Sequence, residues 1–258
     1  MKNVLKEKLD QGTRVLGTFH EIGSATAVEA LGYGGLDYVI IDTEHGPFEP
    51  ERVQEFVRAA NGAQITPLVR VKDAQRNSIL KMLDVGAQGL IIPNVHSVEE
   101  VKQVVEYGKY FPVGNRGVAP TSGSSYWTAD YTTQGLDHYF EVSNREQLLI
   151  PQCETRGCLE NIEEIVALDG VDGIFVGPYD LSTALGKPGQ FGDQEVIDAI
   201  ARVIKACKDA GKYSFMYTGT IDGVKANYAL GYDAVCYGMD AIMLIEATKN
   251  LVAAVKEN

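Results

Sequence analysis

Eight short apolar runs recur along the chain, separated by longer segments in which apolar residues return at helical spacing. A continuous apolar run of this kind is typical of a strand that is buried on both faces of a parallel sheet. We therefore predict eight strands, at residues 15–19, 38–42, 67–71, 90–93, 148–154, 174–177, 213–217 and 234–238.

The segments between the runs predict helices at residues 24–31, 50–60, 76–84, 97–109, 157–166, 193–210, 222–229 and 240–255. Four helix-to-strand junctions carry a glycine, which often ends a helix because it adopts left-handed backbone angles freely (Gly32, Gly86, Gly170, Gly231). Alternating helices and strands predict a parallel α/β fold. Eight repeats favour a closed (β/α)8 TIM barrel over a doubly wound open sheet.

Length and composition agree with one barrel domain, residues 1–258. A chain of 258 residues with 45% hydrophobic positions can bury a full core, and about 250 residues is usual for this barrel. Residues 110–147 are rich in Gly, Ser, Thr and Tyr. We predict a long irregular loop there, which could cover a site.

The charge and the cysteines exclude several classes of protein. The net charge of −12, from 35 acidic and 23 basic residues, comes without a block of basic residues, so nucleic-acid or membrane binding is not expected. The cysteines lack a paired Cys-x-x-Cys spacing and indicate reduced thiols (Cys153, Cys158, Cys207, Cys236). Residues 1–11 lack the apolar core of a signal peptide. The sequence predicts a cytoplasmic protein.

Polar side chains that could do chemistry gather where the predicted strands end. They follow the second strand (Asp42, Glu44, His45), end the third (Arg70) and the fifth (Gln152, Glu154), and follow the sixth (Tyr179, Asp180). Active sites of (β/α)8 barrels lie at the carboxyl ends of the strands. We expect the site there.

Glu154 and Asp180 are candidate ligands of a hard divalent cation such as Mg²⁺ or Mn²⁺, which prefers oxygen ligands. From spacing alone, Asp180 could instead cap a short helix at 181–185, and Glu154 could pair with Arg156. Arg70 could pair with an acid or stabilise a developing oxyanion.

Six segments, in order along the whole chain, carry a family resemblance. They are residues 41–47 (IDTEHGP), 68–71 (LVRV), 83–93 (LDVGAQGLIIP), 114–118 (GNRGV), 152–154 (QCE) and 177–182 (GPYDLS). Together they resemble the HpcH/HpaI aldolases, class II pyruvate aldolases of the phosphoenolpyruvate/pyruvate barrel superfamily. The resemblance implies reversible cleavage of a 2-keto-4-hydroxy acid into pyruvate and an aldehyde.

The resemblance also implies residue roles. Mg²⁺, Mn²⁺ or Co²⁺ would bind Glu154 and Asp180 and stabilise the enolate. Arg70 would stabilise the charge on the 2-keto oxygen, and Gln152 would contact pyruvate. The backbone around Tyr179 and Asp180 would hold the pyruvate carboxylate.

His45 would exchange a proton with the C4 hydroxyl group of the substrate. The family assigns the group that raises the basicity of this histidine to an aspartate that matches Asp84. However, Asp84 ends a predicted helix and so falls at the opposite end of the barrel. Asp42 is the local alternative, and a neighbouring subunit could supply the missing group.

Relatives are homo-oligomers, commonly hexamers, and often exchange the last helix between subunits. The predicted helix at 240–255 has an apolar stripe that suits packing on its own barrel or on a neighbour.

Departures from the family pattern limit what the resemblance implies about the aldehyde. Many relatives have an arginine for an acidic aldehyde after the segment that matches residues 115–118, but residues 120–126 contain none. Tyr179 replaces a small or amide residue, and His20 and Glu21 replace apolar or small ones. We expect a preference for neutral or hydroxylated aldehydes.

Three other functions are compatible with parts of the pattern. A CoA-ester lyase of the superfamily would need a basic surface, and 110–147 offers only Arg116 and Arg145 as charged anchors. A Schiff-base aldolase would need a buried lysine, for which Lys72 is the candidate. A non-catalytic barrel that binds a keto acid would not need His45.

Overall fold

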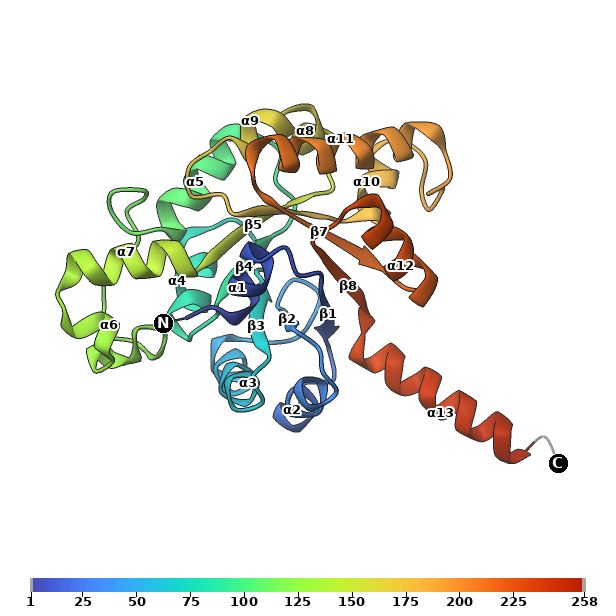
Figure 1. Ribbon diagram of the computed structural model, residues 1–258, viewed down its shortest axis with the longest axis horizontal. Coiled ribbons are helices and arrows are strands. Elements are labelled where there is room, and N and C mark those ends of the chain that lie inside the picture. The colour runs from blue at the N-terminus through green and yellow to red at the C-terminus, as the bar shows by residue number, and fades with distance from the viewer. Residues whose placement is uncertain (1, 257–258) are drawn as a thin grey trace.

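The computed structural model describes residues 2–256 and shows the predicted closed barrel (Figure 1). The parallel strands pair in chain order, and β8 pairs with β1. They are β1 (Val15–His20), β2 (Tyr38–Asp42), β3 (Thr66–Arg70), β4 (Gly89–Ile92), β5 (Leu148–Cys153), β6 (Gly173–Val176), β7 (Tyr213–Thr218) and β8 (Ala234–Met239). The fold class is confirmed, and the prediction placed all eight strands to within two residues.

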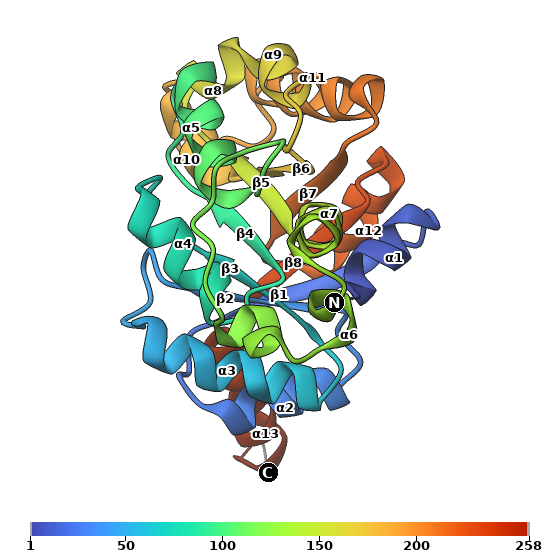
Figure 2. The same ribbon diagram turned by 90° about the vertical axis from the view of Figure 1, so that its left-hand side faces the viewer.

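Helices surround the barrel (Figure 2). They include α2 (Ala25–Tyr33), α3 (Pro50–Gly62), α4 (Arg76–Asp84), α5 (Val98–Gly108), α11 (Gln194–Ala210) and α12 (Ile221–Leu230). The helix predicted at 157–166 is instead two short helices, α8 (Arg156–Glu160) and α9 (Ile162–Val166). They meet at Asn161, whose side chain donates a hydrogen bond to the Gly157 carbonyl and so competes with the helix backbone.

Two apolar layers form the core, one between strands and helices and one inside the barrel. The inner layer includes Leu5 and Leu9 from the amphipathic helix α1 (Val4–Asp10), which therefore closes the amino-terminal end of the barrel. Tyr38 fills part of the interior. A Cβ atom at Gly17 would lie 2.4 Å from the Tyr38 ring, so the adjacent strand needs glycine at this position.

The prediction that residues 110–147 are irregular is wrong for much of this segment. It contains the 3-10 helix η1 (Ser122–Trp127) and the helices α6 (Asp130–Thr133) and α7 (Leu136–Glu146). Arg116, from the same segment, binds Asp84 at the end of α4 and Gln147 just before β5. Within one chain, this part of the segment therefore packs at the amino-terminal end of the barrel, opposite the predicted site.

The last helix, α13 (Asp240–Lys256), leads away from the barrel (Figure 1). Its apolar residues are largely exposed (Ile242, Leu244, Ile245, Leu251, Val252, Val255). Among residues 2–256, no helix combines the length and the apolar character needed to cross a membrane.

Candidate functional site

A cavity of about 200 Å³ opens at the carboxyl ends of the strands. Its polar lining contains predicted site residues from four places in the chain (His45, Arg70, Gln152, Tyr179, Asp180). Aromatic side chains complete the wall (Phe19, Phe175, Tyr217). The structure therefore brings these polar residues together around one small space.

Arg70 is held by carboxylates from the neighbouring strand. Asp42 and Arg70 are paired in the register of β2 and β3. Nε and Nη2 of Arg70 donate hydrogen bonds to the two carboxylate oxygens of Asp42, at 2.9 and 2.5 Å. Nη1 lies 3.2 Å from Oε2 of Glu44, and the guanidinium stacks 4.7 Å from the ring centre of Phe19. Arg70 is thus a fixed positive charge beside the cavity.

The pKa values of Asp42, the last residue of β2, and of Glu44 shift in opposite directions beside Arg70. Burial alone would raise the pKa of Asp42, but the hydrogen bonds and charge of Arg70 hold it below its ordinary value. Burial raises the pKa of Glu44 despite the charge of Arg70. Asp42 is therefore the ionised partner in the Arg70 pair.

Glu154 is a buried carboxylate that the surrounding chain holds in place. Oε1 accepts a hydrogen bond from the backbone N–H of Asn94 at 2.6 Å, and Oε2 accepts one from the side chain of Gln152. Burial raises the pKa of Glu154, and the negative charge of Asp180 adds to that effect. Asp180 lies in the first turn of α10 (Pro178–Ala184), which follows β6 directly.

The donor set around Glu154 fits a hard divalent cation. The charge of Asp180 adds to the cost of ionising Glu154, and a cation bound by both carboxylates would remove that cost. Oε1 of Gln152 is buried and has no hydrogen-bond partner within the described chain. A Cβ atom at Gly177 would lie 2.9 Å from Oε2 of Glu154, so glycine keeps this oxygen approachable. Within residues 2–256, no group of three or more His, Cys, Asp or Glu side chains could hold a metal. An ion here would rely on the two carboxylates and other oxygen donors.

The two simpler explanations for these acids do not match the structure. The N-cap of α10 is Gly177, three residues before Asp180. The guanidinium of Arg156 donates to the carbonyl of Ala184. Helix capping and pairing with Arg156 therefore do not account for Asp180 and Glu154.

His45 is exposed at the edge of the cavity, and its backbone N–H points to Oδ1 of Asp42 at 3.5 Å. The side chain of Asp42 is committed to Arg70. Asp84 lies at the amino-terminal end of the barrel, 3.0 Å from Nη2 of Arg116. The single chain therefore brings the carboxylate of neither aspartate to the imidazole of His45 through a described hydrogen bond.

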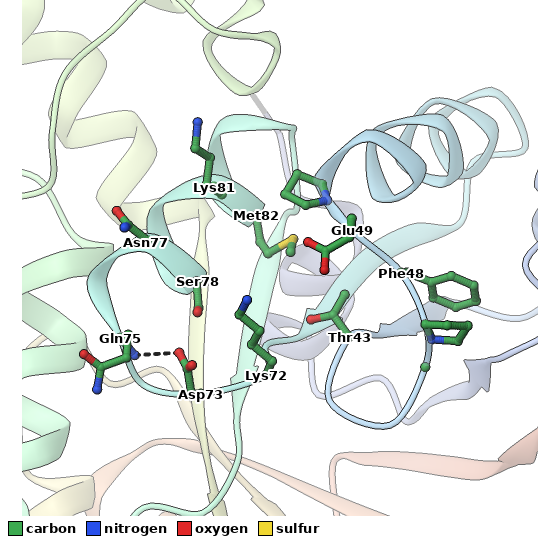
Figure 3. Close-up of a pocket in the computed structure, with 13 residues that line it drawn as sticks. Thr43, Phe48, Glu49, Lys72, Asp73, Gln75, Asn77, Ser78, Lys81 and Met82 are labelled. Atoms are coloured by element: carbon green, nitrogen blue, oxygen red, sulfur yellow. Dashed lines mark hydrogen bonds between the residues drawn. The ribbon is translucent and has the colours of Figure 1, made fainter.

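A larger cavity of about 490 Å³ lies between the loop after β2 and residues 72–82 (Figure 3). Lys72 lines this cavity with Thr43, Glu49 and Met82, and its side chain is exposed. Arg70, two residues earlier, lines the smaller cavity instead. Lys72 therefore does not line the cavity that contains Arg70 and Asp180.

Two further residues near the site had a weak signal in the sequence. His20 and Glu21 stood out only as departures from the family pattern. His20 is fully buried, and its Nδ1 lies 2.7 Å from Oδ2 of Asp240, the first residue of α13. Because Asp240 is distant in sequence, no local motif predicted this pair.

Comparisons with known proteins find a family model, relatives and a solved structure that match most of the chain. The model of the HpcH/HpaI aldolase/citrate lyase family matches residues 16–247. A hydroxypyruvate/pyruvate aldolase from Roseobacter denitrificans is 32% identical over 99% of this chain and 98% of its own. A 2-keto-3-deoxy-L-rhamnonate aldolase from Salmonella gallinarum is 31% identical, over 99% and 94%. The crystal structure of an HpcH/HpaI aldolase/citrate lyase family protein from Burkholderia cenocepacia J2315 superposes with a TM-score of 0.91 at 29% identity, over 99% and 100%.

Proposed function

The chain belongs to the HpcH/HpaI aldolase/citrate lyase family, and we propose that it is a metal-dependent pyruvate aldolase. It would cleave 2-keto-4-hydroxy acids into pyruvate and an aldehyde and catalyse the reverse addition. The observation that carries the proposal is the shared cavity, in which one fixed guanidinium faces an amide and a carboxylate. That combination suits a reaction in which negative charge develops on one oxygen.

Arg70 supplies the fixed positive charge for that oxygen. Cleavage of the C3–C4 bond leaves an electron pair on C3, which delocalises onto the 2-keto oxygen as an enolate. Asp42 fixes the guanidinium before the substrate arrives, so little reorganisation is needed as the charge forms. Gln152 would orient pyruvate through its buried amide.

Glu154 and Asp180 would hold the cation, with Mg²⁺, Mn²⁺ and Co²⁺ as candidates. A bound divalent cation supplies Lewis-acid stabilisation of the enolate charge. Glu154 is already oriented by Asn94 and Gln152, as expected of a carboxylate that a metal will share.

His45 would take the proton from the C4 hydroxyl group during cleavage and return it during addition. Its exposed position at the rim suits a group that meets the aldehyde half of the substrate. A carboxylate from another subunit, such as Asp84, could raise its basicity, whereas Asp42 of the same chain is engaged by Arg70.

The alternatives find less support. Arg116 is buried against Asp84, and Arg145 pairs with Glu146, so neither is a free anchor for CoA phosphates. Lys72 is exposed outside the cavity that contains Arg70, which disfavours a Schiff base. A keto-acid sensor would bind pyruvate without turning it over.

We also propose a homo-oligomer, with a hexamer favoured, in the cytoplasm. The exposed apolar face of α13 supports exchange of this helix between subunits. The four cysteines are free and buried, which suits a reducing compartment.

An aldehyde panel tests the function. Purified protein is incubated with pyruvate, Mg²⁺, Mn²⁺ or Co²⁺, and a series of aldehydes, and new 2-keto-4-hydroxy acids are measured. We expect addition with at least one acceptor. Pyruvate binding without product from any acceptor would favour the sensor instead.

A further inference from the structure

The cavity at the strand ends has a polar side and an apolar side. Its polar residues lie at or after the ends of β2, β3 and β5 and at the start of α10 (His45, Arg70, Gln152, Asp180). Each of them has a role in the mechanism proposed above. The apolar side comes from β1, β6, β7, β8 and the start of α10 (Phe19, Phe175, Pro178, Tyr179, Tyr217, Met239). The mechanism uses none of these side chains.

The aromatic rings on the apolar side contact one another in a row. Phe19, which stacks against Arg70, lies 6.0 Å from Tyr217 between ring centres. Tyr217 lies 6.2 Å from Tyr179, and Tyr179 meets Phe191 edge to face at 4.9 Å and 87°. Phe19 is buried, whereas Tyr179 is 56% exposed. The aromatic surface therefore continues from the buried guanidinium to the opening of the cavity.

Hydrogen bonds hold Tyr179 in this position. Its backbone carbonyl accepts hydrogen bonds from the hydroxyl groups of Ser182, at 2.8 Å, and Thr183, at 2.9 Å. The hydroxyl group of Ser182 is buried and also accepts a hydrogen bond from the backbone N–H of Gly189 at 3.1 Å. Gly189 belongs to the loop that carries Phe191. Ser182 thus links the first turn of α10 to this loop and keeps Phe191 against Tyr179.

We propose that the rings of Tyr179 and Tyr217 select the aldehyde, and that they favour a flat apolar substituent, such as a phenyl group, over a chain of hydroxyl groups. The proposal rests on the aldolase function proposed above and names its substrate class, an aromatic aldehyde. With the pyruvate half held by Arg70 and Gln152, the substituent on C4 would extend toward the opening. Tyr179 is the exposed aromatic side chain of the lining there.

Desolvation explains this selectivity. Among the described residues on the apolar side, only the two tyrosines carry a side-chain hydroxyl group. The hydroxyl groups of a sugar-like substituent would lose their water on this surface and find few partners. An aromatic substituent would instead gain edge-to-face or offset contacts with the rings. Both kinds of substituent are neutral, so the arginine that residues 120–126 lack does not affect this choice.

Competition between benzaldehyde and glyceraldehyde tests the proposal in the Mg²⁺-loaded enzyme with saturating pyruvate. We expect the wild type to prefer benzaldehyde, and the ratio of the two kcat/KM values to fall about tenfold in Tyr179→Ala. The ratio should stay within about a factor of two in Tyr179→Phe, which keeps the ring. The same holds for Tyr33→Ala, a control that removes an exposed tyrosine from the end of α2.

The ratio isolates the side chain of Tyr179 from its backbone. A backbone change that weakens pyruvate binding would lower both kcat/KM values together and leave their ratio as it was. A wild type that prefers glyceraldehyde, or an unchanged ratio in Tyr179→Ala, would overturn the proposal. An equal change in Tyr179→Phe and Tyr179→Ala would also overturn it, because the hydroxyl group rather than the ring would then select the aldehyde.

Binding of a substrate analogue tests the same contact without turnover. 2-Oxo-4-phenylbutanoate carries the keto-acid group and a phenyl group on C4 but lacks the C4 hydroxyl group, so the aldol cleavage cannot occur. Calorimetry with Mg²⁺ should show that it binds the wild type about tenfold more tightly than 2-oxobutanoate does, and that Tyr179→Ala loses this difference. Equal affinities in the wild type would contradict the proposal. A wild type that favours the phenyl compound but adds pyruvate to no aldehyde would contradict the aldolase function and leave the aromatic binding site standing.

Discussion

Gln152 and Glu154 point to the same side of the chain at the end of β5, and the side-chain amide of Gln152 donates a hydrogen bond to Oε2 of Glu154. They share a face because they are two residues apart in extended backbone. The backbone N–H of Asn94 holds the other oxygen of Glu154 at 2.6 Å. The proposed metal ligand is thus fixed by the protein itself, which makes its removal a clean test.

Replacing Glu154 should therefore remove most metal affinity without unfolding the barrel. We expect Glu154→Gln to weaken Mg²⁺ binding by at least about 100-fold, because a neutral amide lacks the charge that a hard cation needs. Titration calorimetry measures the change, and Glu99→Gln, at a 75% exposed side chain, is the control. Equal affinity in the two variants would show that the cation binds elsewhere.

Removing the metal should abolish activity reversibly. Treatment with a chelator should stop the addition of pyruvate to an aldehyde, and added Mg²⁺ or Mn²⁺ should restore it. The decisive contrary result is full activity in metal-free protein together with borohydride trapping of pyruvate on Lys72. That result would establish the Schiff-base mechanism.

Arg70→Ala should lower kcat by about 10²–10³, because its contact with the keto oxygen strengthens as enolate charge develops. Mg²⁺ affinity should change far less, since Arg70 is not a proposed ligand. Steady-state kinetics and calorimetry on the same preparation separate the two effects, with Arg52→Ala on the exposed face of α3 as the control. Near-normal turnover would remove Arg70 from the mechanism.

The enzyme should favour glycolaldehyde over succinic semialdehyde, as compared by kcat/KM. Residues 120–126 lack an arginine, and two other basic residues are engaged, Arg116 with Asp84 and Lys187 with Asp193. An acidic aldehyde would then lose hydration without gaining a charge partner. A preference for succinic semialdehyde would point to a cation from another subunit.

Asp240→Ala should destabilise the fold by about 2 kcal/mol or more. The substitution leaves buried His20 without its hydrogen-bond partner and removes the acceptor of two backbone N–H groups. His20 and the backbone bonds hold the pKa of Asp240 below its ordinary value against the effect of burial. The contribution of Asp240 is therefore present above its ordinary pKa and is lost as pH falls through the lowered value. Urea unfolding at pH 7 and pH 3 should show a smaller difference between variant and wild type at pH 3.

The barrel could be predicted because its evidence is local and repeated. Each apolar run needs only its own residues to indicate a buried strand, and strand order follows from short right-handed connections. The candidate site was predictable for the same reason, since Arg70 and Glu154 come at the ends of such runs. The structure of residues 110–147 was harder to predict. Leu136–Glu146 forms a helix that begins after Gly135 without a side-chain cap, so the usual sequence signal for a helix start is missing.

The missing parts of the site depend on long-range pairs. The contact between His20 and Asp240 becomes visible only when β8 closes on β1. For Asp84, the family resemblance implies a contact with His45 that the fold of one chain does not allow. Asp84 lies beside Arg116 at the amino-terminal end of the barrel, so it cannot contact His45 of the same chain. Sequence spacing contains neither relationship.

Leu5 and Leu9 of α1 close the amino-terminal end of the barrel. Both reactants therefore enter through the same opening, at the carboxyl ends of the strands. In the proposed mechanism, an aldehyde that occupied this opening before pyruvate would block access to Arg70 and Gln152. We therefore expect ordered binding, in which pyruvate enters before the aldehyde and leaves after it.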